Sequence, residues 1–492
     1  MSKRIIQTLT LLLLLGVSVT ALITTRSAAQ QANVASSARN AAIVAATTEV
    51  LKETSEIREL AILRPVKSGA QSREAIEQML IKNLNEQVTP AEMQATELAL
   101  RKFGLAPKDF QYRSFMIKLL TEQVAGYYDP RLQKFHLADW LEVEGQKPVM
   151  SHELTHALQD QHFNLRRFEK WPRGDSDAQL AAHALIEGDA TLEMTIYMAK
   201  NPLVALAFSR SLLSGVATEQ YNQAPRAMRE SLIFPYLQGM EWATQLFKKG
   251  GWAMVSAAFT KLPLSTEQIM HAEKYFSYER PVKVVLPDLT NLLNSRQQTA
   301  NSKPPSADGV QRMAETAQRA TGTTGVPPAS RRLKNSRKRN GSAPVATASS
   351  PVATSLWHHV DSDVNGEWTY YLVLDQFLNA PQESKRAAAG WAGDRYALYE
   401  GPNDQVLLAQ LTAWDSENDA REFFDAYVKR TRLRYPDATV IETATKNSKL
   451  ENLYSWQTSE GGVTIELRGS RVAILEGVPD GVDASVLMRG LD

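Results

Sequence analysis

The chain has 492 residues, a formal net charge of +1 and no cysteine. The balanced charge argues against nucleic acid as a partner. The lack of cysteine excludes disulfides, thiolate metal ligands and a cysteine nucleophile. A chain of this length is expected to contain roughly two to four domains.

The N-terminus has the pattern of a secretory signal peptide over residues 1–29. Two basic residues precede an apolar run, residues 5–23, and the small residues at 27–29 offer a cleavage site. An uncleaved membrane anchor is the alternative, because the run is near the length that a membrane span needs. Both interpretations predict an exported protein that is periplasmic, secreted or anchored in the membrane and facing away from the cytoplasm.

Residues 30–293 are predicted to form a mainly helical domain. After a small polar leader, the pattern over 41–120 is helical, and it is clearest at 72–85 and 89–103. In the last of these helices Thr89 is placed to cap the N-terminus, and a proline follows it at the first helical position.

A β-hairpin is predicted in the middle of this domain. Residues 123–128 and 132–137 alternate between apolar and polar side chains, and Asp129-Pro130-Arg131 marks the turn between them. Two roles are open for this hairpin. It supports the helix that follows, or its edge binds an extended peptide through main-chain hydrogen bonds.

The helix after the hairpin carries the sequence H-E-x-x-H, from His152 to His156. Positions four apart share a helix face, so both imidazoles can bind one metal ion. The other side of the helix is apolar, with Met150, Leu154, Ala157 and Leu158. Two imidazoles suit Zn²⁺, and one ion per chain is expected. Glu153 lies where a carboxylate can take a proton from a zinc-bound water.

Two residues compete for the place of third ligand. Glu187 lies on a second predicted helix, residues 177–198, and would complete a His₂Glu site. His162 has the spacing of a three-histidine pattern, H-E-x-x-H-x-x-G-x-x-H. That pattern has a glycine where this chain has Gln159, and the glycine lets the chain turn back to the metal. The glutamine therefore favours Glu187.

Three downstream residues are candidates for stabilising the oxyanion of peptide hydrolysis, which zinc alone seldom stabilises fully. Tyr236 lies in an apolar helical stretch, residues 204–259, in which no membrane span is predicted. His271 and Tyr275 follow it, four residues apart. Ordinary packing is the alternative for each. The scarcity of histidine, 8 in the whole chain, favours His271.

Three segments together resemble the gluzincin type of metallopeptidase: residues 124–130, residues 152–162 and residues 187–190. The resemblance covers residues 119–199 and is closest to exported or membrane-attached bacterial members. It implies a zincin-like, mainly helical core with a strand before the active helix that pairs with substrate. It also implies three zinc ligands, His152, His156 and Glu187, and Glu153 as the general base.

One part of the gluzincin pattern differs here. Members of that group often place an acidic residue one turn after the ligand glutamate, where it orients a zinc-bound histidine. This chain has Thr191 at that position. Asp189 is therefore the first candidate for the orienting role and Asp160 the second, because a zinc-bound histidine needs a partner for its other ring nitrogen.

Residues 294–355 are predicted to form a disordered linker, because they are rich in Ser, Thr, Ala, Pro and Gly and almost lack large apolar residues. A basic run at 331–339 could touch an anionic surface such as lipid head groups or nucleic acid. A solvated linker is the simpler interpretation of that run.

Residues 356–492 are predicted to form a C-terminal domain. A strand at 406–413, a helix at 416–433 and a hairpin of 463–467 with 473–477 suggest a small α/β sandwich. No catalytic pattern is recognisable in this part of the sequence.

The predicted fold class is α+β, with a mainly helical zincin-like metallopeptidase core, a small β-hairpin or sheet, and a C-terminal α/β sandwich-like domain. The expected function is hydrolysis of a peptide or protein substrate by an exported zinc enzyme. One alternative is a non-catalytic envelope interaction protein that keeps the fold and the metal. Another is an assembly factor held at the membrane by its linker or N-terminus. The intact Glu153 favours the enzyme, since a site without turnover has no need of its base.

Overall fold

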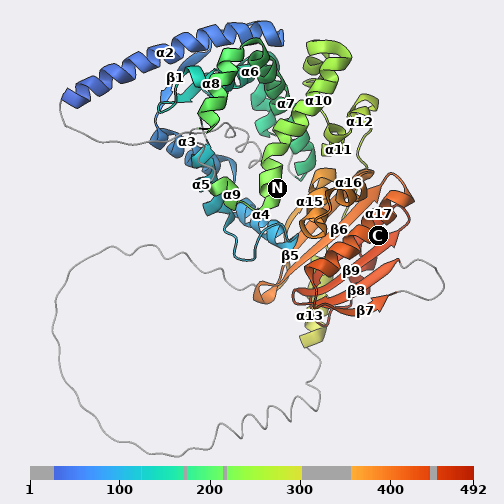
Figure 1. Ribbon diagram of the computed structural model, residues 1–492. Helices are drawn as coiled ribbons and strands as arrows, with labels where there is room; N and C mark the ends of the chain where they lie inside the picture. Colours follow the sequence, from blue (N-terminus) through green and yellow to red (C-terminus); the bar gives the residue numbers. More distant parts are fainter. Residues whose placement is uncertain are drawn as a thin grey trace, which may run out of the picture.

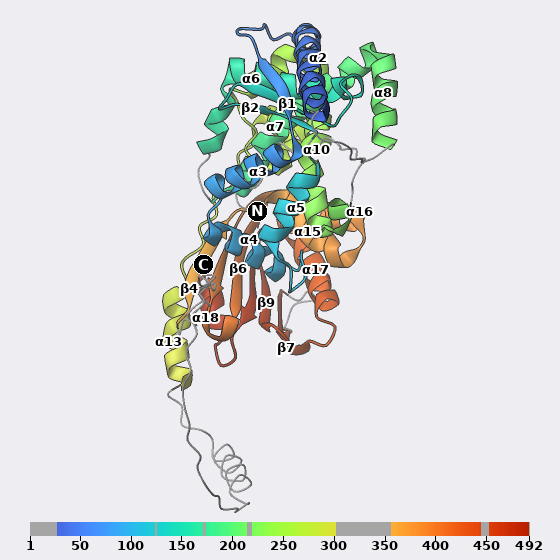
Figure 2. The same cartoon turned by 90° about the vertical axis from the view of Figure 1, so that its left-hand side faces the viewer.

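Figure 1 shows the computed structural model, which describes residues 27–123, 125–170, 174–213, 219–301, 356–443 and 452–491. A helical body lies against a seven-stranded antiparallel sheet, as the two views in Figures 1 and 2 agree. The chain is thus mixed α and β, which confirms the predicted α+β class. Most of the predicted signal peptide and linker, residues 1–26 and 302–355, lies outside the described residues.

The N-terminal part of the body is built from α2 (Ser27–Arg58), α3 (Arg73–Gln87), α4 (Pro90–Lys102) and α5 (Tyr112–Gln123). Local capping explains where two of these helices begin. The Ser72 side chain accepts a hydrogen bond from the Ala75 amide at the start of α3. Thr89 and Glu92 form a reciprocal capping box at the start of α4, as the sequence predicts for Thr89.

A three-stranded sheet lies inside this body, with β1 (Lys67–Gln71), β2 (Gly126–Asp129) and β3 (Lys134–Ala138) in the order β1-β3-β2. The predicted hairpin is present as β2 and β3. Strand β1 falls in a stretch that the sequence predicts to be helical, and it pairs in parallel with β3. That pairing joins segments far apart in the chain, so the local pattern does not reveal it. β2 is left as an edge strand.

The centre of the body consists of three helices, α6 (Lys147–Phe163), α7 (Ser176–Lys200) and α10 (Arg226–Ala258). α7 and α10 form the most extensive contact between helices. They cross at a pair of glycines, and a Cβ added at Gly188 would lie 2.2 Å from the backbone of Gly239. Without Cβ atoms the two backbones can touch, which brings the side chains on either side of the crossing close together.

Shorter elements complete the body: η1 (Glu144–Gln146), η2 (Leu165–Lys170), α8 (Pro202–Leu213), α9 (Glu219–Gln223), α11 (Thr266–Met270) and α12 (Ala272–Ser277). No helix among the described residues is both long and apolar enough to cross a membrane.

The C-terminal sheet has the order β4-β5-β6-β10-β9-β8-β7. Its strands are β4 (His358–Asp363), β5 (Trp391–Glu400), β6 (Val406–Trp414), β7 (Thr439–Thr443), β8 (Leu453–Thr458), β9 (Gly461–Arg468) and β10 (Arg471–Val478). The short helix η3 (Pro402–Asp404) lies between β5 and β6. The predicted strand at 406–413 and the hairpin of 463–467 with 473–477 are present as β6 and as β9 with β10.

Helices cover both faces of this sheet. One face packs against α15 (Gly366–Leu378), α16 (Pro381–Ala388) and α17 (Glu417–Arg434), and the other against α13 (Thr290–Asn301) and α18 (Ala484–Arg489). Leu289 and Leu293 lie in the same apolar cluster as Leu487 and Met488 of α18. The predicted domain boundary at residue 293 therefore falls inside α13, in a segment that packs with the C-terminal sheet.

A single hydrophobic core runs from the helical body into the face of the sheet that α15, α16 and α17 cover, and α15 packs against α10 and α11 at this junction. Buried polar contacts cross the same junction. The Asp363 carboxylate accepts a hydrogen bond of 2.8 Å from the Ser176 amide at the start of α7. Arg430 donates to the Phe103 carbonyl at the end of α4, at 2.6 Å. The C-terminal sheet thus helps to hold the helices that carry the site described next.

Candidate metal centre

Three atoms of types that can bind a metal ion converge in the helical body, from side chains of α6 and α7. The Nε2 atoms of His152 and His156 lie 3.1 Å apart. The Glu187 Oε2 atom lies 3.0 Å from the first and 3.4 Å from the second. All three side chains are buried, with exposed fractions of 2%, 10% and 0%. Of the two residues that compete for the third position, the structure brings Glu187 to the histidines.

The donor set and its spacing fit a zinc ion. Two imidazole nitrogens and one carboxylate oxygen are typical ligands of catalytic zinc, which binds them at about 2.0–2.2 Å. A tetrahedron with bonds of that length has ligand atoms about 3.3 Å apart, close to the 3.0–3.4 Å found here. The other carboxylate oxygen of Glu187, Oε1, is buried and has no hydrogen-bond partner among the described residues. A buried polar atom in that condition is costly unless something else binds it.

The electrostatics of the cluster couple these groups. Burial alone would raise the pKa of Glu187, but His156 and the hydrogen bond from His152 outweigh it and lower that pKa to about 2. Burial alone would lower the pKa of His156, but the Glu187 carboxylate raises it to about 9. The glutamate is therefore ionised, as a metal ligand must be.

Glu153 lies beside the cluster and is held by the edge of the small sheet. Its Oε2 atom accepts a hydrogen bond of 2.8 Å from the main-chain amide of Tyr128 in β2. Burial, with a contribution from the Glu187 charge, raises the pKa of Glu153 to about 8. The structure thus places the predicted base next to the ligands and fixes one of its two oxygens.

Tyr236 is the one of the three predicted oxyanion-binding residues that lies at this cluster. Its ring stacks on His152, with centroids 5.9 Å apart. Burial and the charges of Glu187 and Glu153 raise its pKa well above the ordinary value for tyrosine. The glycine crossing explains the position, since Tyr236 is one turn before Gly239 on α10.

His271 and Tyr275 are not among the residues that form the cluster, and their contacts lie elsewhere. The Nε2 atom of His271 bonds Glu367 of α15 at 2.9 Å. The Tyr275 hydroxyl donates to the Lys261 carbonyl at 2.8 Å, and its ring packs edge-on against Trp242. His271 thus lies at the junction between the helical body and the sheet, where it pairs with a carboxylate, and Tyr275 packs within the helical body.

The predicted orienting carboxylates, Asp189 and Asp160, do not contact a ligand histidine either. Asp160 accepts hydrogen bonds from the Tyr128 hydroxyl and from Arg64, both at 3.0 Å. Asp189 forms a buried ion pair with Arg58 at 2.5 Å. The partner of His156 is instead Gln159, whose Oε1 atom lies 2.9 Å from the histidine Nδ1. Gln159 lies three residues after His156 and therefore on the same helix face, and this spacing is the sequence feature that could have identified it.

Two other histidines, His162 and His183, lie near the motif in the sequence and are not among the three residues of the cluster. The Nε2 atom of His162 lies 2.7 Å from the Ala61 carbonyl, outside the cluster, and α6 ends just beyond it at Asn164 in a left-handed conformation. His183 is one turn before Glu187 on α7 and is buried. Burial lowers its pKa to about 4, although the Glu187 charge partly opposes this.

A second acidic group, Glu267, Glu279 and Asp415, has the proximity of a metal site. The ammonium of Lys274 lies among these carboxylates, at 2.6, 3.0 and 2.5 Å respectively. The lysine already supplies the positive charge and the hydrogen-bond donors that a cation would supply. This group is therefore an ion-pair cluster.

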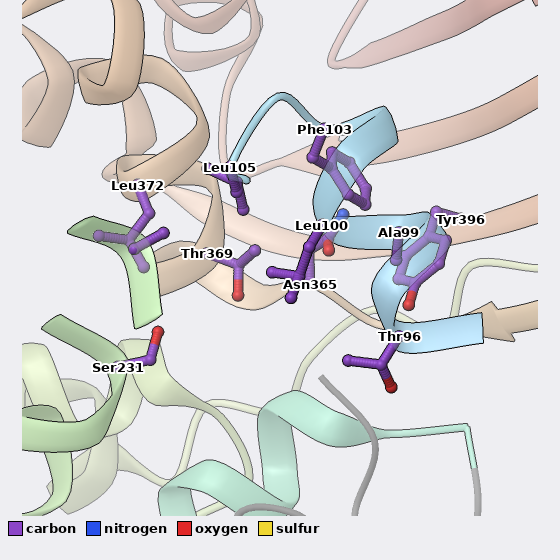
Figure 3. Close-up of a pocket in the computed structure, with 11 residues that line it drawn as sticks. Thr96, Ala99, Leu100, Phe103, Leu105, Ser231, Asn365, Thr369, Leu372 and Tyr396 are labelled. Carbon is purple, nitrogen blue, oxygen red and sulfur yellow. The ribbon is translucent and has the colours of Figure 1, made fainter. Parts of the chain in front are cut away.

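Figure 3 shows a pocket at the junction of the helical body with the sheet. It is lined by Thr96, Ala99, Leu100, Phe103, Leu105, Ala227, Ser231, Asn365, Thr369, Leu372 and Tyr396. These residues come from α4 and the turn after it, α10, the start of α15 and β5. None of them belongs to the metal-binding cluster, so the pocket is separate from it.

Comparison with protein families finds one match, to a domain of unknown function (DUF8575), over residues 354–488. The match covers the C-terminal sheet with α15, α16 and α17. It includes none of the residues of the metal centre. No curated protein and no solved structure matches the chain.

Proposed function

We propose that this protein is a zinc-dependent hydrolase and, from its resemblance to gluzincins, an exported metallopeptidase with a zincin-like core. The observation that carries the proposal is the convergence of His152, His156 and Glu187 in one buried cluster, with Glu153 beside it. A zinc ion held by three protein ligands lowers the pKa of a bound water to about 7 and polarises a carbonyl oxygen.

The chain supplies the proton transfers around such a centre. The amide of Tyr128 holds Oε2 of Glu153. The other oxygen, Oε1, is left to take a proton from water and to return it to the leaving amine. The Tyr236 ring stacks on His152 and its hydroxyl hydrogen-bonds the Glu187 carboxylate, so a donor lies beside the cluster that could turn to a developing oxyanion.

The edge strand β2 supports a peptide as substrate. The Ala138 amide bonds the Ala125 carbonyl at 2.9 Å, so alternate residues of the β2 segment, starting at Ala125, turn their main-chain groups towards β3. The amide of Tyr128 points the other way, towards Glu153. Gly126, two residues earlier, shares its orientation. The outer edge of β2 therefore runs past the general base. This edge is buried, so an extended peptide could pair beside the metal centre only after the covering residues move aside.

The burial of the site favours a narrow substrate. The three ligands are at most 10% exposed, and Glu153 is 5% exposed. A folded protein surface cannot reach groups at that depth. An extended or unfolded segment is the form of protein substrate that fits. It must displace some of the residues that bury the cluster before it reaches the metal site.

The test is to measure bound zinc and cleavage of quenched peptides for the purified full-length chain and three isosteric variants. Glu187→Gln removes a ligand charge and should lose the metal. Glu153→Gln should keep about one zinc per chain and lose activity by about 10²-fold or more. Glu193→Gln is the matched control, because Glu193 is also buried on α7 but bonds Ser151 and Thr155 instead of the cluster. It should keep both zinc and activity.

The outcomes separate the alternatives. If Glu187→Gln binds as much zinc as Glu193→Gln, the proposed ligand set is wrong. If the wild type binds zinc and cleaves no peptide, the non-catalytic interaction protein becomes the better account.

A further inference from the structure

The side chain of Gln159 connects the ligand His156 with helix α7. Its Oε1 atom lies 2.9 Å from the Nδ1 atom of His156. Its Nε2 atom donates to the Ile186 carbonyl at 3.0 Å and to Oδ2 of Asp189 at 2.8 Å. Gln159 is fully buried, so no water competes for these bonds. The amide therefore has three partners fixed by two helices.

These partners determine the orientation of the amide and, through it, the tautomer of His156. A carbonyl oxygen and a carboxylate can only accept, so the NH₂ end of Gln159 must face Ile186 and Asp189. The oxygen end must then face His156 and can only accept from it. In the neutral imidazole, the form that binds a metal, the Nδ1 atom of His156 thus carries the proton, which leaves the lone pair of Nε2 pointing at the cluster with His152 and Glu187.

A second layer holds Gln159 in place. Arg58 of α2 donates from Nε to Oδ1 of Asp189 at 2.5 Å, and both side chains are 0% exposed. The same guanidinium lies over the Trp252 ring, 4.5 Å from its centroid, and bonds the hydroxyl of Ser256 at 3.1 Å. Arg58 neutralises Asp189, so the carboxylate can accept from the glutamine while buried.

We propose that Gln159 is the positioning residue of the metal centre: it fixes the tautomer and ring orientation of His156, and the Arg58–Asp189 pair fixes Gln159. The inference rests on the proposed zinc site. It replaces the carboxylate expected behind the zinc-bound histidine with a neutral amide, and it makes α2 part of the support of the centre.

The experiment compares Gln159→Met with Gln161→Met in the full-length chain. Gln161 lies on the same helix and also makes three hydrogen bonds, to the main chain of Leu63 and Arg64. It contacts no ligand, so its loss measures the general cost of removing a hydrogen-bonded glutamine from α6. The first readout is zinc affinity by chelator competition. The second is the tautomer of His156 in the metal-free protein, read from long-range ¹H–¹⁵N correlations with ¹⁵N-labelled histidine at a pH above its pKa of about 9, where the ring is neutral.

Gln159→Met should weaken zinc binding about 10–100-fold relative to Gln161→Met. It should also change the Nδ1–H tautomer of His156 into a mixture. Equal zinc affinity of the two variants, or an unchanged tautomer, overturns the proposal. The tautomer is read without metal, so it still tests Gln159 if the wild type proves not to bind zinc, an outcome that would refute the proposed function instead.

A charge-conserving exchange covers the case in which Gln159→Met does not fold. Gln159→Glu alone places two carboxylates in contact and should lose metal affinity. Combined with Asp189→Asn, it restores an acceptor for His156 and an amide that donates to the new carboxylate, and only the Ile186 carbonyl loses its donor. The double variant should therefore recover at least 10-fold of the lost affinity. Failure of the exchange in a folded double variant contradicts the role of this chain of contacts.

Discussion

The crossing of α7 and α10 depends on two glycines, and the substitution Gly239→Ala tests it. The added Cβ would lie 2.2 Å from the Ala184 carbonyl oxygen, where ordinary contacts begin at 3.4 Å. The difference of 1.2 Å cannot be absorbed by a side-chain rotation, because the obstacle is helix backbone. The helices must move apart along their most extensive contact.

The expected cost follows from two opposing effects. Overpacking of a buried contact costs about 1–3 kcal/mol, and backbone obstacles belong at the upper end of that range. Alanine is the better helix former by about 1 kcal/mol. The net loss should be about 2 kcal/mol. In a cooperative unit of 150–250 residues this lowers the melting temperature by about 4–8 °C. Tyr236, one turn away, should shift relative to His152.

The assay is thermal unfolding followed by circular dichroism, with zinc content measured on the same samples. Leu237→Ala is the control, since Leu237 is on the same helix and 55% exposed. It should change the melting temperature by much less. If Gly239→Ala melts with the control and keeps its metal, the close approach of the two helices is not what positions the site.

Three further predictions concern stability. Burial lowers the pKa of His136 to about 4, so between about pH 6.5 and pH 4 the unfolded chain binds a proton that the folded chain does not, and stability falls as pH falls. The melting temperature of His136→Phe minus that of the wild type should therefore be larger at about pH 5 than at about pH 7. An equal difference at the two pH values contradicts this prediction. Glu476→Ala leaves the fully buried Arg430 without its carboxylate and should lower the free energy of unfolding, measured by chemical denaturation, by about 3–5 kcal/mol. The control is Glu466→Ala, which removes a partly exposed ion pair and should lower it by at most about 1 kcal/mol. Thr89→Ala removes the capping box of α4 and should cost about 1 kcal/mol in the same measurement.

Features set by neighbouring residues could be predicted from the sequence. The start of α4 follows from Thr89 and Glu92, three residues apart, and the β2–β3 hairpin follows from alternation around Asp129-Pro130. The convergence of His152 and His156 follows from helix geometry alone. The proximity of Glu187, and not His162, to the two histidines agrees with a longer inference, because Gln159 in place of glycine argued against His162.

Features set by distant contacts could not be predicted in this way. The segment of strand β1 has no alternation of apolar and polar residues that distinguishes it from the neighbouring helices. It is a strand because it pairs with β3, which lies far from it in the chain. The Gly188–Gly239 contact joins two helices 51 residues apart in the chain. Scarcity of histidine pointed to His271, but scarcity says nothing about position. The contact of His271 with Glu367 depends on how the C-terminal sheet packs on the helical body.

That packing bears on whether the C-terminal sheet is a separate module. Arg430 and Arg434 of α17 donate to the carbonyls of Phe103 and Lys102, which end α4 and would otherwise lack partners. At the other side of the junction, Asp363 accepts the amide of Ser176 at the start of α7. α7 carries Glu187, so the sheet stabilises the first turn of the helix that supplies the proposed third ligand. Removing the sheet would expose both helix ends and the core they share. A chain ending before β4 should therefore lose the metal centre, even though every ligand precedes that point.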